Sequence, residues 1–245
     1  MSRPEPFDWT YESPRVSIEP TDDPWKLDFA DLEDEPLHRR NYAVRSYRIS
    51  RDRFLIRGVV DDRKTGDSWI PGDDEPVVVH HMVLDLVVEF PSLVIAEANV
   101  VMETHPHEWC IRIEDKYQQL QGVSVARGFT HKVREMFGGP RGCTHVTALL
   151  QAMAPVAVQS IFGMGRANSR EDAIAAGSAT ADQPLPPPTA EEARMAAMVS
   201  LNSCHVWDEE GETVRALKAG ESIPLPLPLQ RRLAKHGFDP DKRLG

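Results

Sequence analysis

The first half of the chain alternates apolar and polar residues in a way that predicts an antiparallel sheet. Segments 42–48 and 54–60 flank a short polar turn and resemble a hairpin. Segment 77–90 is longer, and the face of it that we expect in the core carries Val78, His80, Met82, Leu84, Leu86 and Val88. Segment 93–103 alternates as well. We therefore expect a meander of four or more strands.

Helical spacing replaces alternation in the second half. Segments 115–121 and 130–137 are short, and the second ends at a Gly-Gly pair that is typical of a helix stop. A longer helix is expected from Cys143 onwards, with an apolar stripe at Val146, Leu149, Leu150, Met153 and Val156. Pro155 is expected to kink it. The order predicts an α+β fold, an antiparallel β-meander sheet covered on one face by helices.

Changes in composition divide the chain into four parts. Residues 1–37 form an acidic, proline-rich arm, and residues 38–163 form the main α+β domain. Residues 164–188 are small, polar and proline-rich and are expected to be a linker. Residues 189–245 are expected to form a C-terminal helix-hairpin extension on the main domain, with the hairpin at 203–217.

The two ends carry further expectations. Thr189 and Glu192 form a capping box, which predicts a helix to about Ser200, and a short basic helix is expected in the tail. The arm holds three large apolar side chains that would pack on the main domain or on a second subunit: Trp9, Trp25 and Phe29. We also expect a homo-oligomer.

Charge and composition limit the classes of partner. The formal net charge is −10, from 28 basic and 38 acidic residues, and it would repel nucleic acid and anionic membranes. Residues 1–20 lack the features of a signal peptide, and no stretch is expected to reach the length of a membrane-spanning helix. Three cysteines argue against a disulfide framework. We expect a cytoplasmic protein without nucleic-acid or membrane contact.

The strongest local feature is Gly142-Cys143-Thr144-His145, which follows a glycine-rich turn and begins the long helix. Free amides and the helix dipole at such a point stabilise a thiolate or bind an anion. His145 is then placed to donate a hydrogen bond or to ligate a metal. The alternative is that Thr144 caps the helix and Cys143 is a small buried hydrophobe.

Histidine, arginine and aspartate also lie at the ends of predicted strands. His80 is on an apolar face, where it needs a hydrogen-bond partner or has a functional role; a satisfied core histidine is the commoner case. His38-Arg39-Arg40 precedes the first strand, and Asp61-Asp62-Arg63 ends the second. Together they would form an anion clamp with an acid–base partner, or else surface ion pairs.

Cysteine and histidine supply a second kind of chemistry. Cys110, Cys143 and Cys204 each lie within a few residues of a histidine, and with His145 they offer ligands suited to zinc or iron. No Cys-x-x-Cys pair is present. A phosphate-binding loop, a dinucleotide fingerprint and a nucleophile elbow are also absent from the sequence.

These features, in this order, resemble the bacterial Domain of Unknown Function 2889 family. The likeness covers roughly residues 38–215 and rests on the following positions: His38-Arg39-Arg40, Asp61, Arg63, His80, Glu97-Ala98, Pro106, Cys110, Gly142 to His145, Gln159 and Cys204 to Trp207. The family usually has Thr where this chain has Arg39, and an acidic residue where it has His81. The resemblance implies that this chain is similar to proteins that are associated with the catabolism of aromatic compounds.

Three functions follow as hypotheses. The first is an enzyme without a cofactor, a lyase that abstracts a proton and releases a small aldehyde such as formaldehyde from a lignin-type aromatic molecule. Its expected catalytic residues are His80, His145, Arg40, His38, Asp61 and Arg63, and its expected substrate-binding residues are Cys143, Thr144, Gln159 and Trp109. The second is a metal-binding or metal-delivery protein that uses Cys110, Cys143, His145 and Cys204. The third is a non-catalytic ligand-binding module.

Overall fold

The computed structural model describes residues 37–66, 69–73, 75–126, 128–180, 200–221 and 227–237. Except for Leu37, the expected arm lies outside the described residues. The expected capping box at Thr189 and Glu192 lies outside them too.

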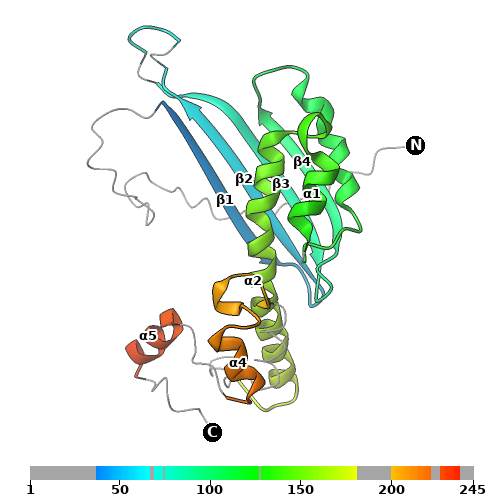
Figure 1. Cartoon of the computed structure of the whole chain (residues 1–245), viewed down its shortest axis with the longest axis vertical. Helices are drawn as coiled ribbons and strands as arrows, with labels where there is room; N and C mark the ends of the chain where they lie inside the picture. Colours follow the sequence, from blue (N-terminus) through cyan, green and yellow to red (C-terminus); the bar gives the residue numbers. More distant parts are fainter. Residues whose placement is uncertain are drawn as a thin grey trace. The chain divides into compact units, whose positions relative to one another are not determined.

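A four-stranded antiparallel sheet forms the centre of the fold, in the order β1-β2-β3-β4 (Figure 1). Its strands are β1 (His38–Arg48), β2 (Arg53–Lys64), β3 (Val77–Glu89) and β4 (Ile95–Thr104). Each strand pairs with the next one along the chain, so the predicted meander is confirmed. β1 and β2 extend beyond the predicted segments at the end that carries the polar residues, because cross-strand pairing continues there.

Helices follow the sheet and cover one face of it (Figure 1). In chain order they are the 3-10 helix η1 (Cys110–Leu120), α1 (Phe129–Phe137), the 3-10 turn η2 (Gly139–Arg141) and α2 (Thr144–Ala175). The α+β class and the helical layer on an antiparallel sheet are therefore as predicted. α2 packs on β1, β2 and β3, whereas η1 packs on β4.

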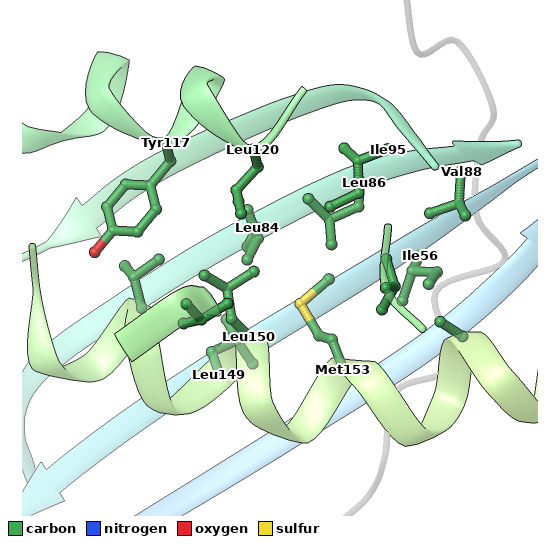
Figure 2. Packing of buried hydrophobic residues seen from close by; sticks show 14 of the residues in the cluster. Ile56, Leu84, Leu86, Val88, Ile95, Tyr117, Leu120, Leu149, Leu150 and Met153 are labelled. Carbon is green, nitrogen blue, oxygen red and sulfur yellow. The ribbon is translucent and has the colours of Figure 1, made fainter. Parts of the chain in front are cut away.

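The core lies between this face of the sheet and the helices. Figure 2 shows Leu149, Leu150 and Met153 of α2 pointing towards the side chains of the strands. All three are fully buried, as are Ile56 and Leu84 opposite them. The helix approaches β2 closely at Gly58, where an added Cβ would lie 2.6 Å from the Met153 sulfur. The main buried helix was thus predicted correctly, and Pro155 lies inside it without ending it.

α2 is longer than expected. It continues to Ala175, so the first part of the predicted linker at 164–188 is helical. Ion pairs connect its last turns to the end of β1 and to the β1–β2 turn: Arg48 contacts Glu171 at 2.6 Å, and Arg51 contacts Asp172 at 2.8 Å. These long-range pairs were not visible in the composition of the segment.

The length of α2 also corrects the expectation about membrane-spanning segments. By length and composition alone α2 would be able to cross a membrane, with a mean hydropathy of 1.5 over an 18-residue window, of which 28% is buried. A core helix has the same character, and α2 contributes six buried side chains to the described structure.

The C-terminal part differs from the prediction. The hairpin expected at 203–217 is wrong: this segment forms the 3-10 turn η3 (His205–Trp207) and the helix α4 (Glu212–Lys218). Glu212 lies in the first turn of α4 and Lys218 in the last, which matches the helix dipole. The expected basic tail helix is present as α5 (Leu227–Lys235).

Candidate functional site

A row of polar side chains crosses three strands at one end of the sheet. Arg40 of β1 is paired with Asp62 of β2, and Asp62 is paired with His80 of β3. Because alternate residues of a strand share a face, Asp62 lies on the same side as Val60 and therefore faces the helices. The start of α2 brings His145 to the same point.

Asp62 is the centre of this group, and its side chain is fully buried. Arg40 binds it with two parallel hydrogen bonds, from Nε to Oδ1 at 2.5 Å and from Nη2 to Oδ2 at 2.6 Å. His38 Nε2 lies 3.4 Å from Oδ1. A buried carboxylate needs such partners, and a bidentate arginine is the strongest that a protein offers.

Two imidazoles contact the same carboxylate oxygen. His80 Nδ1 lies 3.0 Å and His145 Nε2 lies 3.3 Å from Asp62 Oδ2. The two rings are 3.6 Å apart between centroids and tilted by 30°. An ionised carboxylate only accepts hydrogen bonds, so the hydrogen bond to Asp62 assigns the proton of a neutral His80 to Nδ1. Nε2 of His80 is then an acceptor.

Burial and charge set the protonation states. Burial by itself would raise the pKa of Asp62, but hydrogen bonds from Arg40 and His38 and the nearby positive charges lower it to about 2. The hydrogen bond to Asp62 raises the pKa of Arg40. Burial lowers the pKa of His80 and outweighs the attraction of Asp62. Burial, together with the charges of His80 and Arg40, lowers the pKa of His145. The structure thus favours a carboxylate, a guanidinium and two neutral imidazoles.

The start of α2 is fixed by Tyr117 of η1. The Tyr117 hydroxyl accepts a hydrogen bond from the backbone N–H of Cys143 at 2.7 Å and donates one to the Cys143 carbonyl at 3.2 Å. Tyr117 is fully buried and stacks on Phe137, with ring centroids 4.5 Å apart. Cys143 Sγ lies 3.8 Å from His145 Nδ1. Cys143 is the N-cap of α2, with no side-chain cap, so the alternative in which Thr144 caps the helix is wrong.

Asp61 and Arg63, two of the expected catalytic residues, lie elsewhere. Asp61 follows the opposite alternation from Asp62 and contacts Arg63 at 2.7 Å and His81 at 3.2 Å. This second cluster is therefore on the other face of the sheet. The acidic residue that joins the expected histidines and Arg40 is Asp62, which the prediction passed over. The strand pattern held the signal, because Asp62 is in phase with the buried residues Phe54, Ile56 and Val60.

Three expected substrate-binding residues are also away from Asp62 or turned to solvent. Thr144 is exposed at the first turn of α2. Gln159 is exposed and lies 14 residues beyond His145, about 21 Å along the helix at 1.5 Å per residue. Trp109 is 65% exposed, and the guanidinium carbon of Arg112 lies over its ring, 3.8 Å from the ring centroid. Of the four expected residues, Cys143 alone has a described contact with a member of the Asp62 group.

The four expected metal ligands do not form one cluster, although Cys143 and His145 are in contact. Among the described residues, one set of three possible ligand atoms lies within 4.8 Å of one another, and it consists of Asp62, His80 and His145. Cys110 packs beside the core at the start of η1, whereas Cys204 is exposed in the C-terminal part. The cysteine-based metal site is therefore corrected to a possible site with one carboxylate and two imidazoles.

A hollow of about 360 Å³ is present at the opposite end of the strands from the Asp62 group. It is lined by Arg53 and Glu89, which pair across β2 and β3, and by Val94, the start of β4 and the turn after η1. It shares no residue with the group around Asp62. That group reaches solvent through its own members, since the side chain of His38 is 43% exposed and that of His145 is 20% exposed.

One comparison with known proteins gives a match. Residues 38–159 match the model of a family described as "Protein of unknown function (DUF2889)". No curated protein and no solved structure matches the chain. The matched range begins at His38 and includes every residue that contacts Asp62 in the described structure. The Asp62 group is therefore a part of the family domain.

Proposed function

We propose that this chain, which belongs to the DUF2889 family of proteins of unknown function through residues 38–159, is a proton-transfer enzyme. In this proposal His80 is the general base. The reaction class that we propose is a lyase reaction on a small aromatic molecule, with no cofactor. The observation that carries the proposal is the shared contact of His80 and His145 with one oxygen of the buried Asp62.

The contact with Asp62 supports His80 as the base. It holds the Nδ1 proton, so Nε2 carries the free lone pair. The lowered pKa of His80 keeps the ring neutral near pH 7, which is the state that a base needs. Once His80 has accepted a proton, the carboxylate stabilises the imidazolium, as an aspartate does in other acid–base sites. His145 has its second nitrogen directed at Cys143 and is less available.

Arg40 takes a different role from the expected one. Two of its nitrogens bind Asp62, so its charge is directed at the carboxylate rather than at a substrate. We propose that Arg40 is a positioning residue that keeps Asp62 ionised and fixed. His38 is the most exposed side chain that contacts Asp62 and is the one best placed to meet a bound molecule.

A release of an aldehyde of the retro-aldol type suits this arrangement, with an aryl group in place of the carbonyl group that stabilises the carbanion of an ordinary retro-aldol reaction. His80 Nε2 would accept the proton of a primary alcohol on the carbon next to an aryl-bearing carbon. The bond between the two carbons would break as the C=O bond of the aldehyde forms. The bonding electrons would pass to the aryl-bearing carbon, which then takes up a proton. An aromatic ring delocalises the developing charge, which is the physical reason to expect an aromatic substrate.

The test uses a set of compounds in which a carbon that bears an aryl group also bears a hydroxymethyl group. Released aldehyde is detected with a trapping reagent. The wild type is expected to release aldehyde from at least one of them. His80→Gln is expected to lose about 10²- to 10⁴-fold in kcat, the usual contribution of a general base. His81→Gln, the neighbouring histidine on the other face, is the matched control and is expected to keep the wild-type rate. Equal rates in the two variants would contradict the proposal, and binding without turnover would favour a ligand-binding module.

A metal-binding function is the second candidate, because Asp62, His80 and His145 offer a carboxylate and two imidazoles to one point. This donor set suits zinc or iron. The position of Arg40 weighs against it. A cation at this point would lie beside a guanidinium and would compete with it for both oxygens of Asp62.

A further inference from the structure

Cys143 extends the group around Asp62 by one more side chain. Its Sγ lies 3.8 Å from His145 Nδ1, and His145 Nε2 lies 3.3 Å from Asp62 Oδ2. Thiol, imidazole and carboxylate thus form a continuous chain through the two nitrogens of one ring. A thiol carries a proton and a neutral imidazole has one nitrogen that accepts, so this contact suits transfer of the thiol proton to Nδ1 of His145.

We propose that Cys143 is a nucleophilic thiol, with His145 as its base and Asp62 as the residue that orients the base, and that it adds to the carbonyl carbon of a small aldehyde. Nucleophile, base and orienting group within hydrogen-bond reach are the arrangement that activates cysteine and serine in enzymes. The inference uses Asp62 and His145 but does not require His80 to act as a base.

The backbone around Cys143 supports a carbonyl as the electrophile. Tyr117 holds the N–H and the carbonyl of Cys143, which fixes the origin of the side chain. The following residues, from Thr144, begin a 32-residue helix, and the N–H groups of its first turn have no acceptor within the helix. Such donors beside a nucleophile stabilise the negative oxygen that forms when a carbonyl is attacked.

The step is a reversible addition without oxidation or reduction. The thiol proton passes from Sγ to Nδ1 of His145 as Sγ bonds to the carbonyl carbon. The electron pair of the C=O double bond moves to oxygen. The oxygen then takes the proton back from Nδ1, which gives a hemithioacetal and restores the neutral imidazole. Reversal of the same steps releases the aldehyde.

Alkylation rates test the thiol directly. Full-length protein is treated with iodoacetamide at pH 7, and modification of each cysteine is followed by mass spectrometry. Cys143 is half-buried, whereas Cys204 is exposed and has no imidazole contact in the described part of the chain. We expect Cys143 to react about tenfold faster than Cys204 despite its burial, since the imidazole of His145 is within reach to accept the thiol proton. If Cys143 of the wild-type protein is alkylated at the same rate as Cys204 or more slowly, the proposal is overturned.

Substitutions separate this inference from the proposed lyase function. His145→Gln is expected to slow alkylation of Cys143 about tenfold, while His81→Gln leaves it unchanged. Benzaldehyde labelled with ¹³C at the carbonyl is expected to give a hemithioacetal signal that is lost in Cys143→Ser. Absence of that signal in the wild type contradicts the carbonyl assignment, and unchanged alkylation in His145→Gln contradicts the role of His145. Neither readout depends on aldehyde release from an aryl alcohol.

Discussion

The imidazole rings of His80 and His145 lie 3.6 Å apart between centroids and contact the same oxygen of Asp62. One carboxylate that is already paired with Arg40 has little negative charge left for two imidazolium ions. Two cationic rings at this distance would also repel each other strongly in a partly buried site. The arrangement therefore favours two neutral rings and the uptake of one proton at a time.

Stability should depend on pH in a direction set by these rings. The pKa values of His80 and His145 are lowered on folding, so between these lowered values and about 6.5 the unfolded chain binds more protons. The free energy of unfolding is therefore expected to rise with pH through this window and to level off above it. Urea unfolding from pH 5.5 to 8 measures the slope, and His80→Gln should make it shallower. A free energy of unfolding that decreases as the pH rises through this window would contradict the burial of neutral imidazoles.

Asp62 should matter far more for stability than its neighbour. Asp62→Asn weakens two charge-assisted hydrogen bonds to Arg40, whose side chain is partly exposed, and is expected to cost about 1.5–3 kcal/mol. Asp61→Asn is the matched control. It alters a pair with the exposed Arg63 and is expected to cost at most about 1 kcal/mol. Urea denaturation of both variants gives the comparison, and similar losses would show that Asp62 is not the central carboxylate.

Gly58 tests whether the packing of α2 sets the site. An added Cβ would lie 2.6 Å from Met153 Sδ and 3.0 Å from a methyl carbon of Leu149, both of which are fully buried. Gly58→Ala is expected to destabilise the protein by about 1–3 kcal/mol, as overpacked cores do. The resulting shift of α2 would move His145 relative to Asp62. Thermal unfolding measures the loss, and an unchanged melting temperature would contradict the close approach of α2 to β2.

Metal analysis decides between proton transfer and the second candidate function. Because Arg40 holds both oxygens of Asp62, we expect purified protein to contain less than stoichiometric zinc or iron and to keep its melting temperature in EDTA. Elemental analysis before and after EDTA measures both. A bound metal that is lost in His80→Gln, with a fall in melting temperature, would favour the metal site.

Much of the fold was predictable because local patterns specify it. Strand alternation and the apolar stripe from Val146 to Met153 predicted the sheet, the helical layer and the buried face. The prediction of a hairpin at 203–217 was wrong because the few apolar residues of this segment fit a short helix as well as a strand. The last turns of α2 form ion pairs with Arg48 and Arg51, more than 100 residues away in sequence, and such long-range contacts cannot be predicted from local composition.

The site was predicted in part. His38, Arg40, His80 and His145 were identified by their unusual places in the pattern, and all four contact Asp62. The choice between Asp61 and Asp62 depends on the phase of β2, which is fixed by pairing with β1 and β3. The role of Tyr117 depends on a tertiary hydrogen bond to Cys143 and has no local sequence signal.

The proton positions on the two histidines test the central claim most directly. Long-range ¹H–¹⁵N NMR of the imidazoles at pH 7 reports which nitrogen of each ring carries hydrogen, and His80→Gln and His145→Gln assign the signals. We predict a neutral His80 with its proton on Nδ1 and a neutral His145 ring. A His80 ring protonated on Nε2, or two cationic rings at pH 7, would contradict the assignment of His80 as a base oriented by Asp62.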